Sequence, residues 1–377
     1  MSTLNVNNID KESGSTLTIG GSGTTVNVSN MVPDVALSNR SVIINGAMQV
    51  AQRATQVTGV TTSAYRTCDR WLAALGSLGT WTVDQSTDAP NGFSNSLKTT
   101  CTTADASPAA SDYCILIHYI EAQNLQHLAF GTADAKSMTL SFWVKSNKTG
   151  SASWGIRQSD NSNKMISKSY TINSADTWEY KTISIPADTA GVINNDNGTG
   201  SQLDWWLNSG SDFTGGSHAT TWSTFDNTRR NPSNLGVGGA VNDYFAITGV
   251  QLEVGDVATP FEHESYAETL QKCLRYYYKT DNLGVGVGTN STSINLRTSF
   301  NVFMRTSPTA SVAGTNWEVS DDYSADVTAA TPTIGTTYTV SNSSWRGRLE
   351  GFSGIGTGRF YGCKPSSTSL IAFDAEL

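Results

Sequence analysis

The sequence is poor in charged residues. Asp, Glu, Lys and Arg make up 15% of its 377 residues, whereas globular proteins average about 25%. The 24 Lys and Arg against 32 Asp and Glu leave a net charge of −8. A protein that binds nucleic acid through its phosphates needs the opposite sign, so we expect no nucleic-acid partner.

Long apolar runs are also missing. The longest is Tyr113–Ile120, and His118 interrupts it. A helix that crosses a bilayer needs about 20 apolar residues, so we predict no membrane insertion. Met1–Asp10 contains neither a positive nor an apolar segment. We therefore expect no secretory signal and synthesis in a cytosol.

Cysteine and histidine are too few and too scattered for a metal site. The five cysteines include no CxxC pair, and the four histidines form neither HxH nor HExxH. We expect free, buried thiols, and no metal or other cofactor. Asn194–Gly198 resembles part of a calcium loop, but it lacks the distal acidic residue, and a plain turn explains it better.

Motifs for catalysis are absent as well. There is no GxSxG nucleophile turn, no GxGxxG and no GK[ST]. Glycoside hydrolysis needs two carboxylates placed across a sugar. Asp204, Asp212, Glu253 and Glu262 lie near aromatic residues, but among 32 acidic residues such neighbours arise by chance. We predict that the chain is not an enzyme and has no catalytic residues.

What the sequence does contain is many short apolar or alternating segments, separated by loops rich in Gly, Asn, Asp and Pro. This pattern predicts a mainly β protein whose larger part is a sandwich of two sheets. The strands expected in the sandwich are 41–46, 101–103, 112–119, 137–145, 178–186, 202–208 and 243–253.

The period changes after Pro260. Apolar residues at helical spacing predict one helix within 262–279, which either lies on the sandwich or packs on symmetry mates. Its apolar stripe is Tyr266, Leu270, Cys273, Leu274 and Tyr277. Further strands at 276–279, 293–304, 309–313, 336–340, 346–352 and 370–373 predict a second, smaller β domain.

The N-terminal residues 1–38 form a distinct arm of Ser, Thr, Asn and Gly. Two similar phrases, Ser15–Gly20 and Gly23–Val28, predict short strands separated by glycine turns. Strands this short gain a core only by packing on a neighbour or on copies of themselves. The alternative is a disordered leader, and we favour a docking segment.

The segment Gln202–Trp222 combines three tryptophans with Asp, Asn, Ser and Thr. An indole face stacks on the apolar face of a sugar while the polar groups bind its hydroxyls. Our candidates for glycan binding are Asp204, Trp205, Trp206 and Trp222, with Trp345 and Tyr361 near the C-terminus. The alternative is that Trp206 and one other tryptophan fill the sandwich core. Trp143 is similarly either covered or offered to a ligand.

Five phrases along the chain resemble, in order, a group of bacteriophage tail-fibre proteins. They are Arg40–Arg53, Cys68–Trp71, Ser141–Lys145, Ile247–Gly255 with Pro260–Glu262, and Cys273–Tyr277. The strands at 141–145 and 249–253 also resemble those of carbohydrate-binding jelly rolls. The resemblance implies a homotrimeric virion fibre whose N-terminus docks on the particle and whose distal domains meet the host surface. It transfers no binding residue.

We therefore expect three parts: a docking arm at 1–38, a jelly-roll domain at 39–262, and a helix with a small β domain at 263–377. The expected function is that of a phage tail fibre on the virion, made in the bacterial cytoplasm, which recognises a host surface glycan and contacts other tail or virion proteins through its arm. Three alternatives stay open: a capsid head fibre or decoration protein, a polysaccharide-trimming tail enzyme, and a structural spacer.

Overall fold

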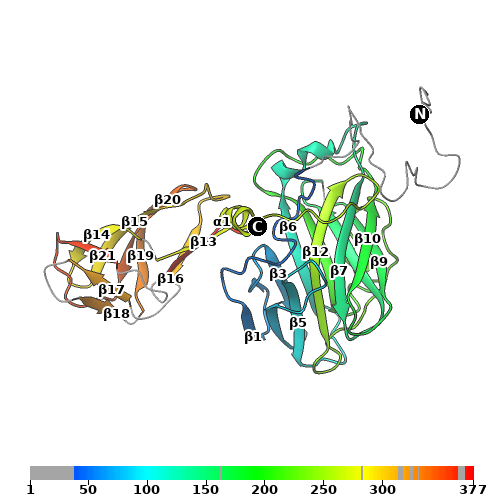
Figure 1. The fold of residues 1–377 in the computed structure, drawn as a ribbon, viewed down its shortest axis with the longest axis horizontal. Helices are drawn as coiled ribbons and strands as arrows, with labels where there is room; N and C mark the ends of the chain where they lie inside the picture. Colours follow the sequence, from blue (N-terminus) through cyan, green and yellow to red (C-terminus); the bar gives the residue numbers. More distant parts are fainter. Residues whose placement is uncertain are drawn as a thin grey trace, which may run out of the picture. The chain divides into compact units, whose positions relative to one another are not determined.

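The structure, a computed structural model, describes residues 38–161, 163–281, 283–312, 317–321, 326–329, 331–363 and 370–377. The predicted docking arm lies outside these residues except for its last position, so its role stays a prediction. The described chain is mainly β, as the sequence predicts (Figure 1). None of its helices is long and apolar enough to cross a membrane.

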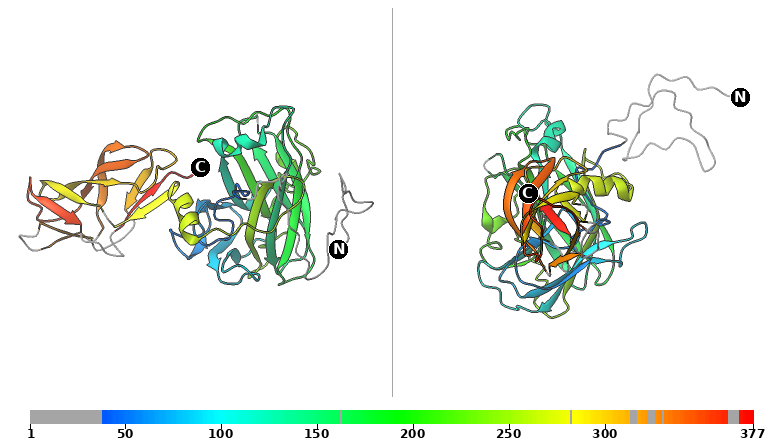
Figure 2. Two further views of the ribbon diagram at one scale, coloured as in Figure 1. Left: turned by 45° about the horizontal axis from the view of Figure 1, so that its top comes forward. Right: turned by 90° about the vertical axis from the view of Figure 1, so that its left-hand side faces the viewer.

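Two antiparallel sheets form a sandwich (Figures 1 and 2). The first sheet has the order β1-β4-β5-β12-β7-β10, with bounds Gln56–Val60, Thr80–Ser86, Ser96–Thr103, Tyr244–Val254, Met138–Ser146 and Glu179–Ile185. The second sheet has the order β2-β3-β6-β11-β8-β9, with bounds Ala64–Tyr65, Trp71–Gly76, Tyr113–Glu121, Thr199–Ser209, Gly150–Gln158 and Met165–Ile172. Short 3₁₀ helices occur at η1 (Ala122–Leu128) and η2 (Asn227–Arg229).

Six of the seven strands predicted for the sandwich are confirmed, because β5, β6, β7, β10, β11 and β12 cover them. The strand predicted at 41–46 is wrong. Asn45 takes a left-handed conformation (φ 59°), and its side-chain amide donates to the carbonyls of Val50 (2.9 Å) and Asp69 (3.0 Å). An Asn that bonds nearby backbone in this way favours a turn over a strand.

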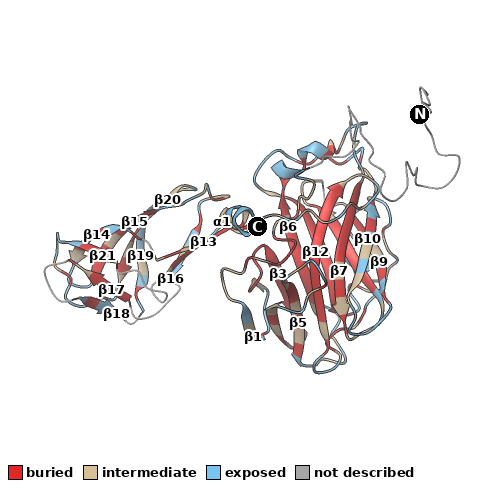
Figure 3. Ribbon diagram, viewed as in Figure 1, coloured by how far each residue is buried: buried red, intermediate tan, exposed pale blue. Residues whose placement is uncertain are grey.

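The sandwich core lies between the facing sheets, and the central strands are buried along most of their length (Figure 3). Side chains that are almost completely buried fill it, including Trp71, Trp81, Phe142, Trp154 and Trp205. Large aromatic residues bury the most surface per residue, so they contribute most to the stability of a two-layer core.

One α-helix follows the sandwich, α1 (Tyr266–Leu274). It is shorter than the predicted helix. Ser265 begins it with a capping box: its hydroxyl accepts from the Glu268 backbone, and the Glu268 side chain accepts from the Ser265 backbone. Cys273 lies on the buried face, but Tyr266 is 56% exposed and does not belong to that face, contrary to the predicted stripe.

The C-terminal part has two further sheets. One has the order β13-β22-β16, with bounds Tyr277–Thr280, Ile371–Asp374 and Thr309–Val312. The other has the order β18-β17-β21-β14-β15-β20-β19, with bounds Val327–Ala329, Trp317–Ser320, Phe360–Cys363, Val285–Asn290, Ser293–Ser299, Ser344–Glu350 and Thr333–Val340. Its apolar core shares no residue with the sandwich core, which agrees with a second β domain.

Buried charges connect residues of the sandwich to the C-terminal part. Arg70 is fully buried, pairs with Glu376, and lies with its guanidinium 3.5 Å from the centre of the Tyr276 ring. Its Nη2 donates to the carbonyl of Tyr119 (2.8 Å). Arg275, just after α1, donates two hydrogen bonds of 2.8 Å to the carboxylate of Glu121. These contacts satisfy charges that would otherwise be buried without partners.

Asp69 lies in the same region and should make stability depend on pH. Burial raises its pKa from 3.8 to about 6, although hydrogen bonds from Gln52 and the charge of Arg53 act in the opposite direction. Because the folded pKa is raised, the contribution of Asp69 is fully present below about pH 4 and is lost as the pH rises through about 6. Relative to wild type, Asp69→Asn should gain roughly 2–3 kcal/mol of unfolding free energy from acid to neutral pH.

Urea unfolding of both proteins over that pH range measures this difference. Asp88→Asn serves as the control, because Asp88 is a surface carboxylate whose pKa is lowered through hydrogen bonds from Lys145 and Trp178, despite the opposing effect of desolvation. It should therefore lose stability relative to wild type as the pH rises. Parallel pH curves for wild type and Asp69→Asn would contradict the prediction.

Candidate functional site

Strand β11 separates the candidates that are neighbours in sequence. Successive side chains of a strand point to opposite faces, so Trp205 enters the sandwich core while Asp204 and Trp206 lie on the outer face of the second sheet. The Trp205 ring packs 5.3 Å from Trp71 and 5.8 Å from Phe142. It is 0% exposed and offers no surface to a sugar. A side chain buried in this way cannot stack on a glycan, contrary to the prediction for Trp205.

Trp206 lies on the outer face but is covered there. Phe213 packs on it at 5.2 Å between ring centres, and the guanidinium of Arg230 lies 4.7 Å from its ring centre. Its other neighbours are the small apolar cluster that includes Ile115 and Ile117. Trp206 therefore lies beneath Phe213 and Arg230 on this face, and it holds Arg230 by a cation–π contact.

A polar network crosses the outer face beside Trp206. Arg157 on β8 donates to Oε1 of Gln202, and Nε2 of Gln202 donates to Oδ1 of Asp204 (2.6 Å). Nη2 of Arg230 donates to Oδ2 of Asp204 (2.9 Å). Both oxygens of Asp204 are thus engaged, and this buried carboxylate holds Arg230 directly and Arg157 through Gln202.

The network contains more positive than negative charge. Burial lowers the pKa of Arg157, and the nearby Arg230 acts in the same direction, against the attraction of Asp204. An arginine nevertheless stays protonated at physiological pH. Since this network has two guanidinium groups and one carboxylate, that of Asp204, the outer face keeps donors that lack a full countercharge, as a site for oxygen-rich ligands requires.

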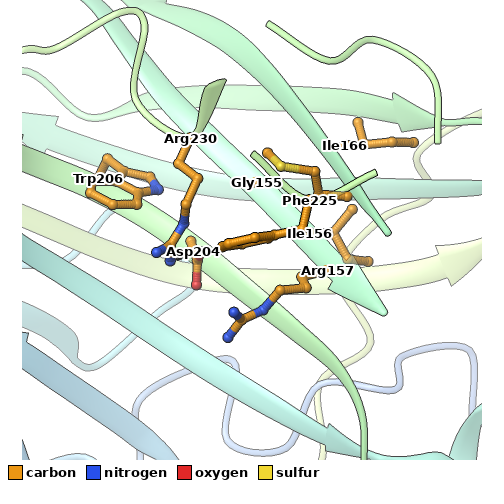
Figure 4. Close-up of a pocket in the computed structure, with 9 residues that line it drawn as sticks. Gly155, Ile156, Arg157, Ile166, Asp204, Trp206, Phe225 and Arg230 are labelled. Carbon is orange, nitrogen blue, oxygen red and sulfur yellow. Dashed lines mark hydrogen bonds and ion pairs between the residues drawn. The ribbon is translucent and has the colours of Figure 1, made fainter. Parts of the chain in front are cut away.

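Phe225 lies between the two arginines (Figure 4). Its ring centre is 5.3 Å from the guanidinium carbon of Arg157 and 5.6 Å from that of Arg230. The space enclosed around them is about 10 Å³, enough for one water molecule and no ligand. An open depression of about 710 Å³, lined by Ser223–Asn227 and Arg229, adjoins Phe225. A ligand therefore has room on the solvent side of Phe225.

The loop that carries Phe225 is attached to the edge of β9. Met165 and Ser223 exchange two backbone hydrogen bonds, of 2.8 and 3.1 Å, and the amide of Ser167 donates to the carbonyl of Ala219 (2.9 Å). At η2 the side chain of Asp226 accepts from the Thr228 backbone. The loop thus has a fixed path over the sheet, which holds Phe225 and Arg230 in place.

The remaining candidates lie elsewhere. Trp222 is half-buried, and its Nε1 donates to the carbonyl of Pro186 (2.8 Å). Trp345 is 0% exposed in the C-terminal core. Tyr361 is 1% exposed, and its hydroxyl accepts from the backbone amide of Gly356 (2.8 Å). The structure thus brings Asp204 and Trp206 together, and it separates both from Trp222, Trp345 and Tyr361.

The sequence analysis missed Arg157, Gln202, Phe225 and Arg230 as site residues. Gln202 was recoverable, because strand alternation places positions 202, 204 and 206 on one face. The other residues come from β8 and from the loop after β11, and no local pattern joins them to Asp204. Only the pairing of β11 with β8 and the return of the loop over the sheet bring them together.

A second partly exposed aromatic pair lies on the outer face of the first sheet. Trp143 on β7 and Tyr180 on β10 are directly opposite in register, with ring centres 5.4 Å apart. Tyr180 is 44% exposed and Trp143 is half-buried. Trp143 is therefore neither fully covered nor fully open.

No family model matches the sequence. No curated protein matches it either. Solved structures that are similar in part include the enzymatically active domain of tailspike protein 4 of bacteriophage CBA120, with 12% identity, a TM-score of 0.29, and coverage of 57% of this chain and 21% of that chain. A second is a Bacteroides thetaiotaomicron protein described as a candidate sugar-binding protein, with 12% identity, a TM-score of 0.34, and coverage of 57% and 100%.

A third is the family 11 carbohydrate-binding module of a Clostridium thermocellum cellulase, with 11% identity, a TM-score of 0.28, and coverage of 55% of this chain and 99% of that chain. The chain spans about a fifth of the tailspike chain that it matches (21%). The structures that this chain partly matches thus include a phage tailspike domain and carbohydrate-binding modules. At these TM-scores they support no conclusion about its activity.

Proposed function

We propose that this chain is a virion fibre protein of a bacteriophage and that it binds a saccharide of the bacterial surface. The observation that carries the binding part is the outer face of the second sheet, where Phe225 lies between Arg157 and Arg230 beside an open depression. The virion part is supported by the five phrases along 40–277 that resemble tail-fibre proteins.

The chemistry of this face suits a sugar. A half-buried aromatic ring such as Phe225 gives an apolar surface for the C–H face of a sugar ring. Guanidinium groups donate several hydrogen bonds in a fixed plane and accept none, so Arg157 and Arg230 would bind hydroxyl or ring oxygens. Tyr119, half-buried and opposite Gln202 in register, adds a second ring and a hydroxyl.

We propose binding without catalysis. Asp204 is the carboxylate of this face, and both of its oxygens already accept hydrogen bonds from the chain. A glycosidase acid must instead hold a proton for the leaving group and work with a second carboxylate. The role of Asp204 in this proposal is to hold the arginines that contact the ligand.

The proposed assembly is a homotrimer whose N-terminal arm contacts another virion protein. Three copies would present three saccharide sites, and simultaneous engagement raises the apparent affinity far above that of one site. Weak single contacts would therefore be sufficient for attachment of a particle to a cell.

Phe225→Ala tests the binding site. The variant should bind surface polysaccharide more weakly by roughly 1–3 kcal/mol per site, by analogy with other aromatic contacts, because the apolar surface between the arginines is lost. Its melting temperature should change little, since Phe225 is half-buried on a surface loop. The measurement is binding of the purified full chain to an array of bacterial surface polysaccharides, alongside thermal unfolding.

Tyr180→Ala is the control, because it removes a partly exposed aromatic ring from the outer face of the first sheet. Normal binding by the Tyr180 variant with loss of binding by the Phe225 variant would support the proposed face. The reverse pattern would move the site to the Trp143 and Tyr180 pair. No binding by the wild-type chain to any polysaccharide would count against the saccharide function.

A further inference from the structure

The outer face of the seven-stranded C-terminal sheet carries a continuous row of side chains. Phe360 on β21 is opposite Val287 on β14, Val287 is opposite Asn295 on β15, and Asn295 is opposite Arg348 on β20. The alternate positions, such as Ile294 and Leu296, are buried in the core, so the row faces outward.

Apolar side chains on this face are strongly exposed. Phe360 is 69% exposed, Val285 is 66% exposed, and Tyr338 on β19 is 40% exposed. Scattered exposed apolar residues need no explanation, but Phe360 and Val285 lie on the adjacent strands β21 and β14, and such a group indicates a surface that contacts something.

Three arginines lie on the same face. Arg297 and Arg346 are directly opposite on β15 and β20, an arrangement in which like charges destabilise a sheet. Neither has an ion pair within the described part of the chain. The guanidinium groups of Arg346 and Arg348 lie 5.2 and 5.7 Å from the centre of the Tyr338 ring.

Arg348 is held in place by the chain itself. Its Nε donates to Oδ1 of Asn295 (3.4 Å), its Nη2 donates to the Tyr338 hydroxyl, and its Nη1 lies 3.8 Å from Glu350. Among the residues that the structure describes, Arg297 and Arg346 have no hydrogen-bond or ion-pair partner of this kind. The face therefore presents two uncompensated guanidinium groups beside a fixed third one, in a chain whose net charge is −8.

We propose that this face binds an acidic saccharide chain that carries carboxylate groups. Arg297 and Arg346 bind the carboxylates, since a guanidinium group matches a carboxylate with two parallel hydrogen bonds. Tyr338 and Phe360 contact the C–H faces of the sugar rings. The row from β21 to β20 crosses three strand spacings, roughly 14 Å, so it takes more than one sugar ring.

This ligand class fits the face better than the other polyanions. The acidic chain as a whole repels nucleic acid at long range. The carboxylates of an acidic peptide would also match the arginines. Such a peptide has no apolar ring face to place on the aromatic rings, Phe360 and Tyr338, near the two ends of the row. The site belongs to a different core from the Phe225 site, and the inference does not rest on the function proposed for that site.

The test uses the purified full chain with polygalacturonate as the acidic probe and dextran as the neutral probe. We expect binding to polygalacturonate that weakens as salt rises, because exposed charges are screened beyond about 10 Å at 0.1 M salt. Dextran should bind at least about tenfold more weakly. Arg297→Ala/Arg346→Ala should weaken polygalacturonate binding by at least about tenfold, the loss of two charge-assisted contacts.

Arg66→Ala/Lys136→Ala is the charge-matched control, since it removes two cations from the sandwich. Equal losses in the two double variants would overturn the proposal, because the attraction would then be unspecific. A single-stranded oligonucleotide or polyglutamate that binds as tightly as polygalacturonate at the same salt concentration would also overturn it. Loss of polygalacturonate binding in Phe225→Ala but not in Arg297→Ala/Arg346→Ala would place the acidic-saccharide site on the sandwich and overturn the proposal.

Discussion

Replacing Trp205 with alanine is expected to lower the free energy of unfolding by about 3–5 kcal/mol. Trp205 is 0% exposed and lies in the middle of the sandwich core, in contact with Trp71, Phe142 and Trp154. Removing an indole leaves a cavity that the surrounding rings fill only in part, since each is fixed by its own neighbours. Urea denaturation followed by circular dichroism measures the loss.

Trp205→Phe is the graded comparison. It keeps an aromatic ring and removes an indole N–H that has no hydrogen-bond partner among the described residues, so it should cost less than the alanine variant. Tyr180→Ala, on the exposed outer face, should change stability by less than about 1 kcal/mol. If Trp205→Ala unfolded like wild type but lost saccharide binding, the indole would have to be accessible, and its place in the core would be wrong.

The sequence predicted the sandwich from alternating apolar segments, and β6, β7, β10, β11 and β12 lie where that alternation is strongest. It did not predict β8, Gly150–Gln158, which is rich in small residues and buried on both faces. The loop after β11 covers the outer face of β8, so apolar and polar residues do not alternate along this strand. Its identity as a strand depends on its neighbours β11 and β9.

The turn at Asn45 shows the opposite error. Ile43 and Ile44 made 41–46 look like a strand, but Gly46 approaches the carbonyl oxygen of Val250 so closely that a Cβ atom there would lie 2.1 Å from it. Only glycine fits such a contact. The partner is more than two hundred positions away in the sequence, so the local pattern contains no sign of it.

The site was predictable only in part for the same reason. Alternation shows that Asp204 and Trp206 lie on one face of the strand and that Trp205 lies on the opposite face. It does not show which face is inside, because both carry tryptophan. That choice depends on Trp71 and Phe142, which lie on different strands. A tryptophan beside polar residues was therefore compatible with both a ligand site and a core.

Arg70→Ala should be about as damaging as the loss of Trp205, at about 3–5 kcal/mol. Arg70 is fully buried between the ring of Tyr276 and the carboxylate of Glu376, and it donates to the carbonyl of Tyr119. Alanine leaves Glu376, whose side chain is 5% exposed, paired with Arg53 (3.4 Å), which also lies 4.0 Å from the buried carboxylate of Asp69. Chemical denaturation monitored by tryptophan fluorescence measures the cost.

A double-mutant cycle of Arg70→Ala and Glu376→Ala separates charge from packing. If the ion pair carries the effect, the two losses are not additive, and the coupling energy is about 1 kcal/mol or more. Arg70→Met is the control for packing, because it keeps a long apolar stem over Tyr276 without the charge. If the methionine variant were as stable as wild type and the losses in the cycle were additive, packing of the Arg70 side chain on Tyr276, and not its charge, would stabilise the fold.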